Sequence, residues 1–360
     1  MSEQGSFSFG NHPVGHPQDG CLPFSWLMES PRAERTAAAG HSNAAACRKV
    51  GTPMSIEQVA HGLLNVTHHT AIACLPWVGG GDENAARQAA TEAMRQRLGQ
   101  VSGSGRIVIG GSGSDDASTL SPGELVSAGP GFRFELAVNP IEDIKACVRD
   151  AQGAMTVAAA AATGSLYDTT GRYMNKLVVG SAAAPAIDIT ASIEKNVVAV
   201  SAALDKLVTE LSVVVLDRPR HRNLVQDLKT IGCRVRLIPD GDVVGALNVL
   251  SGEADMLAGI GGAAEGVLAA CAARCLGGSM QAMLEPQSES ELKQLIEHGE
   301  QPGLPLPLEH LVATDDCCFV VTAVTDTPML RAPRRTDRNA WSTHSLLATA
   351  AQPGLLVETD

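Results

Sequence analysis

Aromatic residues are scarce in this sequence, long apolar runs are missing, and acidic residues outnumber basic ones. Aromatic residues make up 3% of the 360 residues, and the formal net charge is −12 at pH 7. Surfaces that bind nucleic acid need clustered Lys and Arg for the phosphates and often aromatic rings for the bases. No apolar run approaches the roughly 20 residues of a membrane-spanning helix. We therefore expect no nucleic-acid partner and no membrane-embedded segment.

Cysteine is present, but not in the pattern of a disulfide scaffold or a zinc site. The chain has nine cysteines, too few for a disulfide-dense scaffold. Cys271 and Cys275 are one helical turn apart, and Cys317 and Cys318 are adjacent in an expected strand, so the latter two should point to opposite faces. Neither pair has partners at zinc-site spacing. We expect reduced, mostly buried thiols and a reducing compartment, the cytoplasm.

The first 54 residues differ from the remainder in composition. They are rich in Gly, Pro, Ser, His and Ala and show no sustained hydrophobic period, so we expect residues 1–54 to be a disordered extension. Basic residues between 32 and 49 leave open an organelle transit segment, with the plastid stroma as the alternative location. The acidic residues Glu29 and Glu34 count against that alternative.

Hydrophobic periodicity becomes regular from residue 55 onward. Strand-like and helix-like segments then alternate at short spacing, which indicates an α/β fold with sheets covered by helices. We expect one globular part, 55–360, with two α/β subregions at about 55–190 and 191–350. The expected helices are 55–75, 82–98, 189–209, 221–232, 242–250 and 264–276, the expected strands are 106–110, 134–138, 153–162, 212–217, 233–239, 255–261 and 318–324, and a helix plus a loop is expected in 284–310.

Polar side chains follow two successive strands of this pattern. Arg218 and Arg220 come just after one strand, and Asp240 and Asp242 follow the next. Guanidinium groups bind phosphate through paired N–H donors, and ligands of α/β proteins often lie beyond the carboxyl ends of strands. The alternatives are a solvated basic turn and a helix cap. Two polar clusters after neighbouring strands favour a ligand site.

Two glycine-rich segments also follow expected strands. GGSGSDD, residues 110–116, lacks the Lys-Ser/Thr ending of a P-loop and fits no GxGxxG frame, which argues against a nucleotide site. GIGGAAEG, residues 259–266, places Glu265 in the first turn of a helix. That carboxylate either complements the helix dipole or belongs to a metal or anion site at the helix N-terminus. The segment alone leaves both interpretations open.

The segment ELAVNPIEDI, residues 135–144, has the pattern of an apolar strand that stops at Pro140. Glu142 lies just beyond this expected end, and Asn139 is an amide where a second carboxylate would make a metal site. The segment is therefore either an altered metal-binding loop or only a strand terminus.

The order of these motifs resembles one known family. VIGxxxxDDA, AVxPxE, YMxKL, DRPRH, IPDGDV, GIGGAxEG and AARCLGG occur in the order of the class II fructose-1,6-bisphosphatases, including the cyanobacterial type that also acts on sedoheptulose-1,7-bisphosphate. The resemblance covers residues 55–350. It implies the layered α/β/α/β/α sandwich of the lithium-sensitive sugar-phosphatase superfamily. It also implies a divalent metal, Mg²⁺ or Mn²⁺, that activates water against a sugar phosphate.

The resemblance further implies that the metal site is degenerate. In the family loop DPxEGT, Asn139 replaces a metal-binding Asp and Ile144 replaces the Thr that positions the attacking water, whereas Glu142 is kept. Arg87 replaces a metal-binding Asp of the helix motif GxKNTAD, and two glycines replace glutamates of GEGExDDAP. The altered positions are Arg87, Gly111, Gly113, Asn139 and Ile144, and the remnant metal ligands are Glu142 and Glu265.

These changes predict weak metal binding or none. The change from Asp to Arg places a cation where a cation should bind. Two unit charges ~4 Å apart at an effective dielectric of about 20 interact by roughly 4 kcal/mol, and a divalent ion doubles that energy. Mg²⁺ can nevertheless be held by one or two carboxylates together with phosphate and water. We therefore expect no cofactor, or Mg²⁺ or Mn²⁺ bound weakly at Glu142 and Glu265.

The substrate side of the family's site is better kept. The residues that the resemblance assigns to the sugar and its non-reacting phosphate are Tyr173, Arg218, Arg220, Asp240 and Asp242. We hypothesise that the protein binds a sugar bisphosphate but hydrolyses it poorly or not at all, as a sensor, regulatory or assembly subunit. The alternative is an active fructose-1,6-/sedoheptulose-1,7-bisphosphatase that removes the 1-phosphate in gluconeogenesis or the Calvin cycle. By analogy with the family, we expect a homo-oligomer or a mixed oligomer with an active paralogue.

Overall fold

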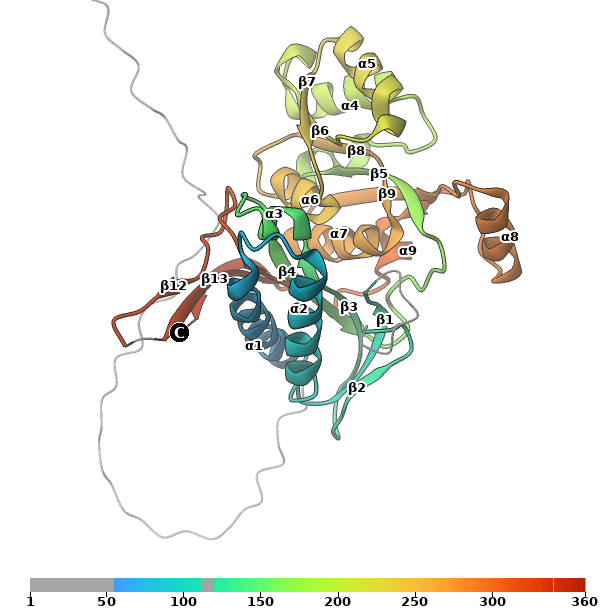
Figure 1. The fold of residues 1–360 in the computed structure, drawn as a ribbon. Coiled ribbons are helices and arrows are strands. Elements are labelled where there is room, and N and C mark those ends of the chain that lie inside the picture. Colours follow the sequence, from blue (N-terminus) through green and yellow to red (C-terminus); the bar gives the residue numbers. More distant parts are fainter. Residues whose placement is uncertain (1–54, 112–119, 339, 360) are drawn as a thin grey trace, which may run out of the picture.

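Two β-sheets form the frame of the molecule. The computed structural model describes residues 55–111, 120–338 and 340–359, and Figure 1 shows the sheets with helices on and between them. The chain builds four strands of the first sheet, then the whole second sheet, and returns to the first sheet for its last strands. The two sheets therefore do not divide at about residue 190 as expected. The sequence shows the order of the strands along the chain but not which strands pair. The expected extension, residues 1–54, lies outside the described residues.

The first sheet has eight strands. They are β1 (Ser104–Ile109), β2 (Leu125–Ala128), β3 (Arg133–Glu142), β4 (Met155–Ala162), β11 (Cys317–Ala323), β12 (Arg334–Arg335), β13 (Trp341–Thr349) and β14 (Gln352–Thr359). Their order is β12-β13-β11-β4-β3-β1-β2, with β14 paired to β13. β1 and β3 run parallel, and the other pairs are antiparallel. The central strands β4 and β11 are buried almost throughout, because helices cover both faces of the sheet.

The second sheet has six strands. They are β5 (Tyr173–Val179), β6 (Ser212–Leu216), β7 (Arg234–Ile238), β8 (Met256–Gly262), β9 (Ser279–Leu284) and β10 (Leu306–Pro307). Their order is β10-β9-β5-β8-β6-β7. β6 runs parallel to both β7 and β8, whereas β5 is antiparallel to β8 and β9. The carboxyl ends of β6, β7 and β8 consequently lie at one edge of the sheet.

Helices form three layers around the two sheets. They are α1 (Ile56–Cys74), α2 (Glu83–Leu98), α3 (Ile144–Val148), α4 (Ile193–Leu204), α5 (Arg222–Ile231), α6 (Asp242–Leu250), α7 (Ala263–Leu276), α8 (Glu289–Glu297) and α9 (Leu308–Leu311), together with four short 3-10 helices at 75–77, 181–186, 208–210 and 219–221. α1 and α2 cover one face of the first sheet, α6 and α7 pack between the sheets, and α4 and α5 cover the far face of the second (Figure 1). This is the expected α/β/α/β/α order.

Most expected helices and strands are present, with two corrections. The helix expected over 189–209 is α4, which is shorter because Ser192 caps its start and Asp205, at a φ of 51°, ends it. The strand expected to stop at Pro140 continues to Glu142. The strands that were not predicted are β2, β5, β9, β10, β12, β13 and β14. In the described part of the chain, none of the helices combines the length and hydrophobicity that a bilayer crossing requires.

The thiols behave as the sequence predicts. The seven cysteines within the described residues are free and buried. Cys317 and Cys318 enter the cores on opposite faces of the first sheet, as neighbours in a strand must. The Sγ atoms of Cys275 and Cys317 lie 3.6 Å apart, so helix α7 and strand β11 are in direct contact through these side chains.

Candidate functional site

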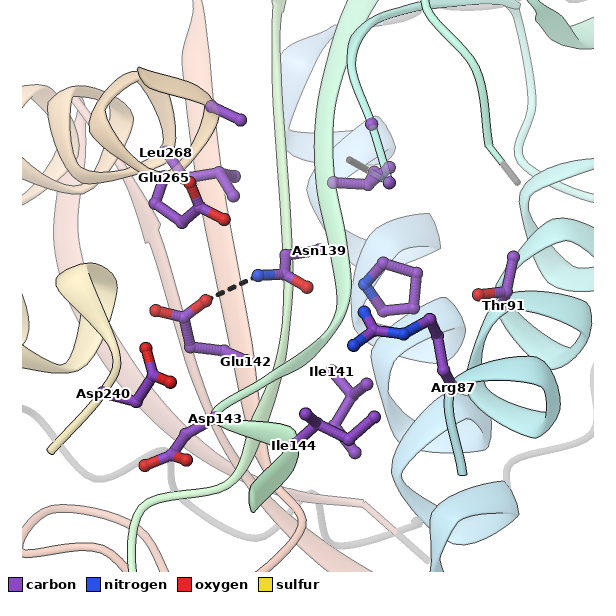
Figure 2. A pocket seen from close by; sticks show the side chains of 15 residues that line it. Arg87, Thr91, Asn139, Ile141, Glu142, Asp143, Ile144, Asp240, Glu265 and Leu268 are labelled. Carbon is purple, nitrogen blue, oxygen red and sulfur yellow. Dashed lines mark hydrogen bonds between the residues drawn. The ribbon is translucent and has the colours of Figure 1, made fainter. Parts of the chain in front are cut away.

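The end of β3 carries a bulge that brings two polar side chains together. The pairing of β3 with β4 shifts register between Asn139 and Glu142, with Pro140 inside the irregular stretch. Proline has no N–H for the ladder, so it is tolerated at a bulge, and the strand passes through it. Asn139 Nδ2 donates a hydrogen bond to Glu142 Oε2 at 2.5 Å (Figure 2). The amide thus turns its N–H, and not an oxygen, toward the retained carboxylate.

Glu142 is buried and connects the end of β3 to helix α6. It is 3% exposed, and its Oε1 accepts a hydrogen bond from the backbone N–H of Val243, in the first turn of α6, at 3.1 Å. Burial raises the pKa of Glu142 well above its usual value, and the negative charges of Glu265 and Asp242 raise it further. Burial and then Asp242 likewise raise the pKa of Glu265. The retained carboxyl groups therefore belong to one cluster of mutually repelling acids.

Asp242 is held by a buried ion pair. Lys176 Nζ, from β5, lies 3.2 Å from Asp242 Oδ2, and the two side chains are 1% and 7% exposed. Lys176 also donates to the carbonyl of Gly262 at 3.0 Å, while the Gly262 N–H donates to the same Asp242 oxygen at 3.0 Å. A Cβ on Gly261 would lie 2.0 Å from that oxygen. The glycines of the GIGG segment therefore let the end of β8 pass against the carboxylate.

Arg218 and Asp240 meet just beyond the carboxyl ends of β6 and β7. Arg218 Nη2 lies 3.0 Å from Asp240 Oδ1, and its Nη1 donates to the carbonyl of Pro239. Because the two strands are parallel, the loops that follow them emerge side by side. The structure thus brings together the two polar clusters that the sequence places after successive strands.

Arg220 and His221 support the same edge. Arg220 Cζ lies 5.2 Å from the centre of the Tyr173 ring, and its Nε donates to the carbonyl of Ile260 at 3.0 Å. His221 Nδ1 donates to the Leu216 carbonyl at 2.7 Å, and its Nε2 accepts from the Ile260 N–H at 2.8 Å. Both ring nitrogens are thus used by the neutral form, and burial lowers the pKa of His221.

Two adjoining pockets collect these side chains. The smaller, of about 240 Å³, lies between α2, the end of β3 and the start of α7, and the larger, of about 800 Å³, continues toward β5 and the ends of β6 and β7. The residues that border both are Gly110, Gly111, Glu142, Asp240, Ala264 and Glu265. All five residues predicted to bind the sugar line the larger pocket: Tyr173, Arg218, Arg220, Asp240 and Asp242.

The altered positions border the smaller pocket. Figure 2 shows Arg87 reaching from α2 toward the wall that carries Asn139 and Glu142. Arg87 is exposed, and within the described residues it has no hydrogen bond or ion pair. Ile144 contributes only hydrocarbon, and Gly111 contributes no side chain. Gly113 lies outside the described residues.

The described part of the pocket offers few carboxylates to a divalent ion. Among residues 55–111, 120–338 and 340–359, no group of three or more His, Cys, Asp or Glu side chains is placed to hold a metal ion. Glu142 and Glu265 supply two carboxylates, which can hold one Mg²⁺ only if water and phosphate complete its shell. Arg87 adds a positive charge on the opposite side of the pocket. Within the described residues, the carboxylates at the positions assigned to metal by the resemblance are therefore those of Glu142 and Glu265.

Sequence reasoning did not identify Lys176, Asp143 or Arg172. Lys176 lies in a strand that was not predicted, and a lone lysine within YMNKLVV was the available signal. Asp143 caps α3 at a φ of 50°, and burial raises its pKa. Arg172 lines the larger pocket beside Tyr173, but it lies in a loop without any periodic pattern.

Comparisons with known proteins agree with this fold and geometry. The family described as bacterial fructose-1,6-bisphosphatase, glpX-encoded, matches residues 57–355. The chain is 36% identical over 297 residues to a fructose-1,6-bisphosphatase class 2 of Haemophilus influenzae, covering 78% of this chain and 89% of that protein. It is 36% identical over 280 residues to a D-fructose 1,6-bisphosphatase class 2/sedoheptulose 1,7-bisphosphatase of Parasynechococcus marenigrum, covering 73% and 84%.

A third relative extends this pattern. The fructose-1,6-bisphosphatase 1 class 2 of Escherichia coli is 35% identical over 297 residues, covering 78% of this chain and 88% of that protein. These identities extend over most of each relative, and the family match runs from α1 to β14. The chain therefore belongs to the class 2 fructose-1,6-bisphosphatase family.

Proposed function

We propose that the protein binds a sugar phosphate or bisphosphate in the two adjoining pockets and hydrolyses it poorly or not at all. In this role it acts as a ligand sensor, a regulatory subunit or an assembly partner. One contrast carries the proposal. The larger pocket is lined by the expected sugar-binding residues. The smaller pocket is bordered by Arg87 and by the amide of Asn139, which donates a hydrogen bond to Glu142.

Ligand binding is supported by the size and chemistry of the larger pocket. A volume of about 800 Å³ suits a small molecule of the size of a sugar bisphosphate. Arg220 offers N–H donors for phosphate oxygens, and Asp240 and Asp242 can accept hydrogen bonds from sugar hydroxyls. One relative is named for both fructose 1,6-bisphosphate and sedoheptulose 1,7-bisphosphate, so we propose these two ligands first.

Weak hydrolysis is supported by what the smaller pocket lacks. Phosphoryl transfer depends mainly on positioning and on neutralising charge at the phosphate oxygens, which bound metal ions supply in metal-dependent phosphatases. Here both oxygens of Glu142 already accept hydrogen bonds, from Asn139 and from the Val243 N–H. Ile144 has no hydroxyl with which to position water. Arg87 can attract a phosphate, but a guanidinium does not generate hydroxide from water as a metal ion does.

The second candidate is a metal-dependent phosphatase that holds its metal ion weakly, and one observation favours it. Glu142 and Glu265 remain close enough for the charge of Glu265 to raise the pKa of Glu142, and a divalent cation would relieve that repulsion. In this case the two carboxylates would hold Mg²⁺ or Mn²⁺, with water and phosphate completing the shell. The bound ion would then supply the activated water.

Release of inorganic phosphate tests the proposal. Fructose 1,6-bisphosphate and sedoheptulose 1,7-bisphosphate would be incubated with the protein at high concentration in Mg²⁺, Mn²⁺ or EDTA. A matched variant would carry Arg87→Asp, Gly111→Glu, Asn139→Asp and Ile144→Thr. We expect no release from the unmodified protein and metal-dependent release from the variant. Turnover by the unmodified protein that EDTA abolishes and that is at least as fast as that of the variant would contradict the proposal and establish the second candidate.

Thermal unfolding with ligand tests the binding half independently. A ligand that binds only the folded state stabilises it by RT ln(1 + L/Kd), where L is the free ligand concentration, so the unfolding temperature rises with ligand concentration. We expect either bisphosphate to stabilise the unmodified protein with EDTA present. If neither sugar stabilises it, with or without Mg²⁺, the chain has a purely structural role.

We further propose that the chain forms a homo-oligomer, or a mixed oligomer with an active paralogue. Leu207 and Ile296 are 69% and 60% exposed and are the type of side chain that subunit contacts bury. Light scattering after size-exclusion chromatography would test this, and a monomer at micromolar concentration would contradict self-association. The free, buried thiols suit the cytoplasm, with the plastid stroma as the alternative if residues 1–54 include a transit segment.

A further inference from the structure

Helix α8 projects from the second sheet and carries apolar side chains on its outer side (Figure 1). Leu292 and Ile296, one helical turn apart, are 39% and 60% exposed, and Leu304, in the segment after the helix, is 51% exposed. Seven large apolar side chains are exposed in the described residues, and these are three of them. A helix of nine residues depends on packing for its stability, so an open apolar stripe on it indicates a contact surface.

Negative charge flanks this apolar stripe. Glu289 and Glu297 lie at the two ends of α8, and both side chains are exposed. Lys293 Nζ lies 3.8 Å from Glu297 Oε1, with the two side chains 77% and 61% exposed. An ion pair so exposed contributes little to stability, so Glu297 can exchange it for another cation. The outer side of α8 is therefore an apolar stripe with acidic ends.

The inner side of α8 is fixed to the rest of the molecule. Leu295 is 1% exposed, and Glu291 accepts a hydrogen bond from the Arg172 N–H at 3.0 Å. Just after the helix, Glu300 accepts from the N–H and the hydroxyl of Thr170 at 2.9 and 2.8 Å. A surface that is held in place in the free protein loses little freedom when it binds a partner.

The β12–β13 hairpin carries the opposite charge. Asp337 is the one acid in the segment 331–338, and Arg331 lies 4.0 Å from Glu358, at the limit for an ion pair. Arg335 Cζ lies 5.0 Å from the centre of the half-buried Trp341 ring, so the hairpin also offers aromatic surface. In a chain with a net charge of −12, this segment concentrates four exposed arginines: Arg331, Arg334, Arg335 and Arg338.

The acidic helix and the basic hairpin are too far apart to meet within one molecule. Figure 1 shows α8 and the β12–β13 hairpin at opposite ends of the molecule, with the sheets between them. Surfaces of opposite charge attract each other and set the orientation in which two proteins meet. Each copy of the chain offers one surface of each kind, so the two surfaces can be matched between copies.

We propose that helix α8 of one copy docks against the β12–β13 hairpin of a second copy. This inference rests on the self-association proposed above and names its two surfaces. Leu292 and Ile296 pack against Trp341 at the centre of the contact, and Glu289 and Glu297 face the arginines of the hairpin. An apolar centre with a charged rim is the usual composition of a protein–protein interface.

Reversal of charge on each surface tests this pairing in the full chain. The hairpin variant carries Arg334→Glu and Arg338→Glu, and the helix variant carries Glu289→Lys and Glu297→Lys. A combined variant carries all four substitutions. The association constant of each protein would be measured by sedimentation over a range of concentrations, and circular dichroism would show whether each variant is folded.

The matched control reverses two charges elsewhere on the surface. It carries Lys195→Glu and Lys229→Glu, at exposed lysines on α4 and α5, and changes the net charge as much as the hairpin variant does. The control should associate like the unmodified protein. NaCl raised from about 0.1 M to about 1 M shortens the Debye length from about 10 Å to about 3 Å and should weaken association of the unmodified protein.

We expect the hairpin variant and the helix variant each to associate about 10- to 100-fold more weakly than the unmodified protein, because like charges then face each other. The combined variant should regain association, and so should an equimolar mixture of the two single-surface variants, because opposite charges face each other again. Unchanged association of both single-surface variants would overturn this inference alone. Loss of association without recovery in the mixture would also overturn it, since the two surfaces would then not face each other. A monomeric unmodified protein would overturn the proposed self-association as well.

Discussion

Replacement of Lys176 by methionine should destabilise the folded chain by several kcal/mol. Lys176 and Asp242 are 1% and 7% exposed, and Nζ lies 3.2 Å from Oδ2. Removal of one partner of a buried ion pair leaves an uncompensated charge, which typically costs about 3–5 kcal/mol. The Gly262 carbonyl, which accepts from Lys176 at 3.0 Å, would also lose its donor. Because Glu142 and Glu265 add negative charge nearby, we expect about 4 kcal/mol, within the range for a broken buried pair.

Equilibrium unfolding in urea, followed by far-UV circular dichroism, measures this loss. Lys176→Met, Asp242→Asn and the double variant complete a mutant cycle, and the double variant should lose much less than the sum of the single losses because neither charge remains. Lys195→Met, at an exposed lysine on α4, is the control and should change stability by no more than about 0.5 kcal/mol. A loss of unfolding free energy below about 1 kcal/mol for Lys176→Met would refute the reasoning, because a buried carboxylate without a partner should destabilise the folded state by more than that.

Three more predictions use the same urea assay. Burial lowers the pKa of His221, so the unfolded chain binds a proton at this side chain more readily than the folded chain does. The free energy of unfolding should therefore stay constant above about pH 6.5 and fall as the pH drops below that value. The His221→Gln variant should lack this fall. Gly259→Ala should lower the free energy of unfolding by about 1–3 kcal/mol, because φ is +126° and the new Cβ would lie 2.9 Å from His221 Nε2. Gly252→Ala is the control and should cost less, because Gly252 has a φ of +83° but open space around it. Phe319→Ala, at a fully buried position in β11, should cost about 3–5 kcal/mol, and a loss under about 1 kcal/mol would contradict its place in the core.

The layered fold could be predicted because its signals are local. The apolar stripe over 82–98 corresponds to α2, and the alternation after residue 212 corresponds to β6, α5, β7, α6, β8 and α7 in turn. The end of β3 could not be placed, because a proline usually marks a stop and only the pairing with β4 shows that Pro140 lies inside a bulge. Local patterns therefore locate elements better than they locate their ends.

The site was only partly predictable, for a related reason. Arg218 and Asp240 follow strands that are consecutive along the chain, so their proximity follows from parallel pairing. The pair of Lys176 with Asp242 has no such signal, because it depends on the start of α6 packing against β5, and β5 was not predicted. Arg172 was missed for the same reason, since its neighbours come from α7 and α8. Contacts between elements that are distant along the chain cannot be predicted from the order of the elements in the sequence.

The position of β11 at the centre of the first sheet has a consequence for synthesis on the ribosome. Every described residue that lines the two pockets precedes this strand in the chain. Until β11 emerges, β4 with its run of alanines has only β3 as a partner, and its open edge can pair with other chains. A nascent chain that ends before Cys317 would carry the whole described pocket and still aggregate, so the last strands act as the completion step on which the ligand site depends.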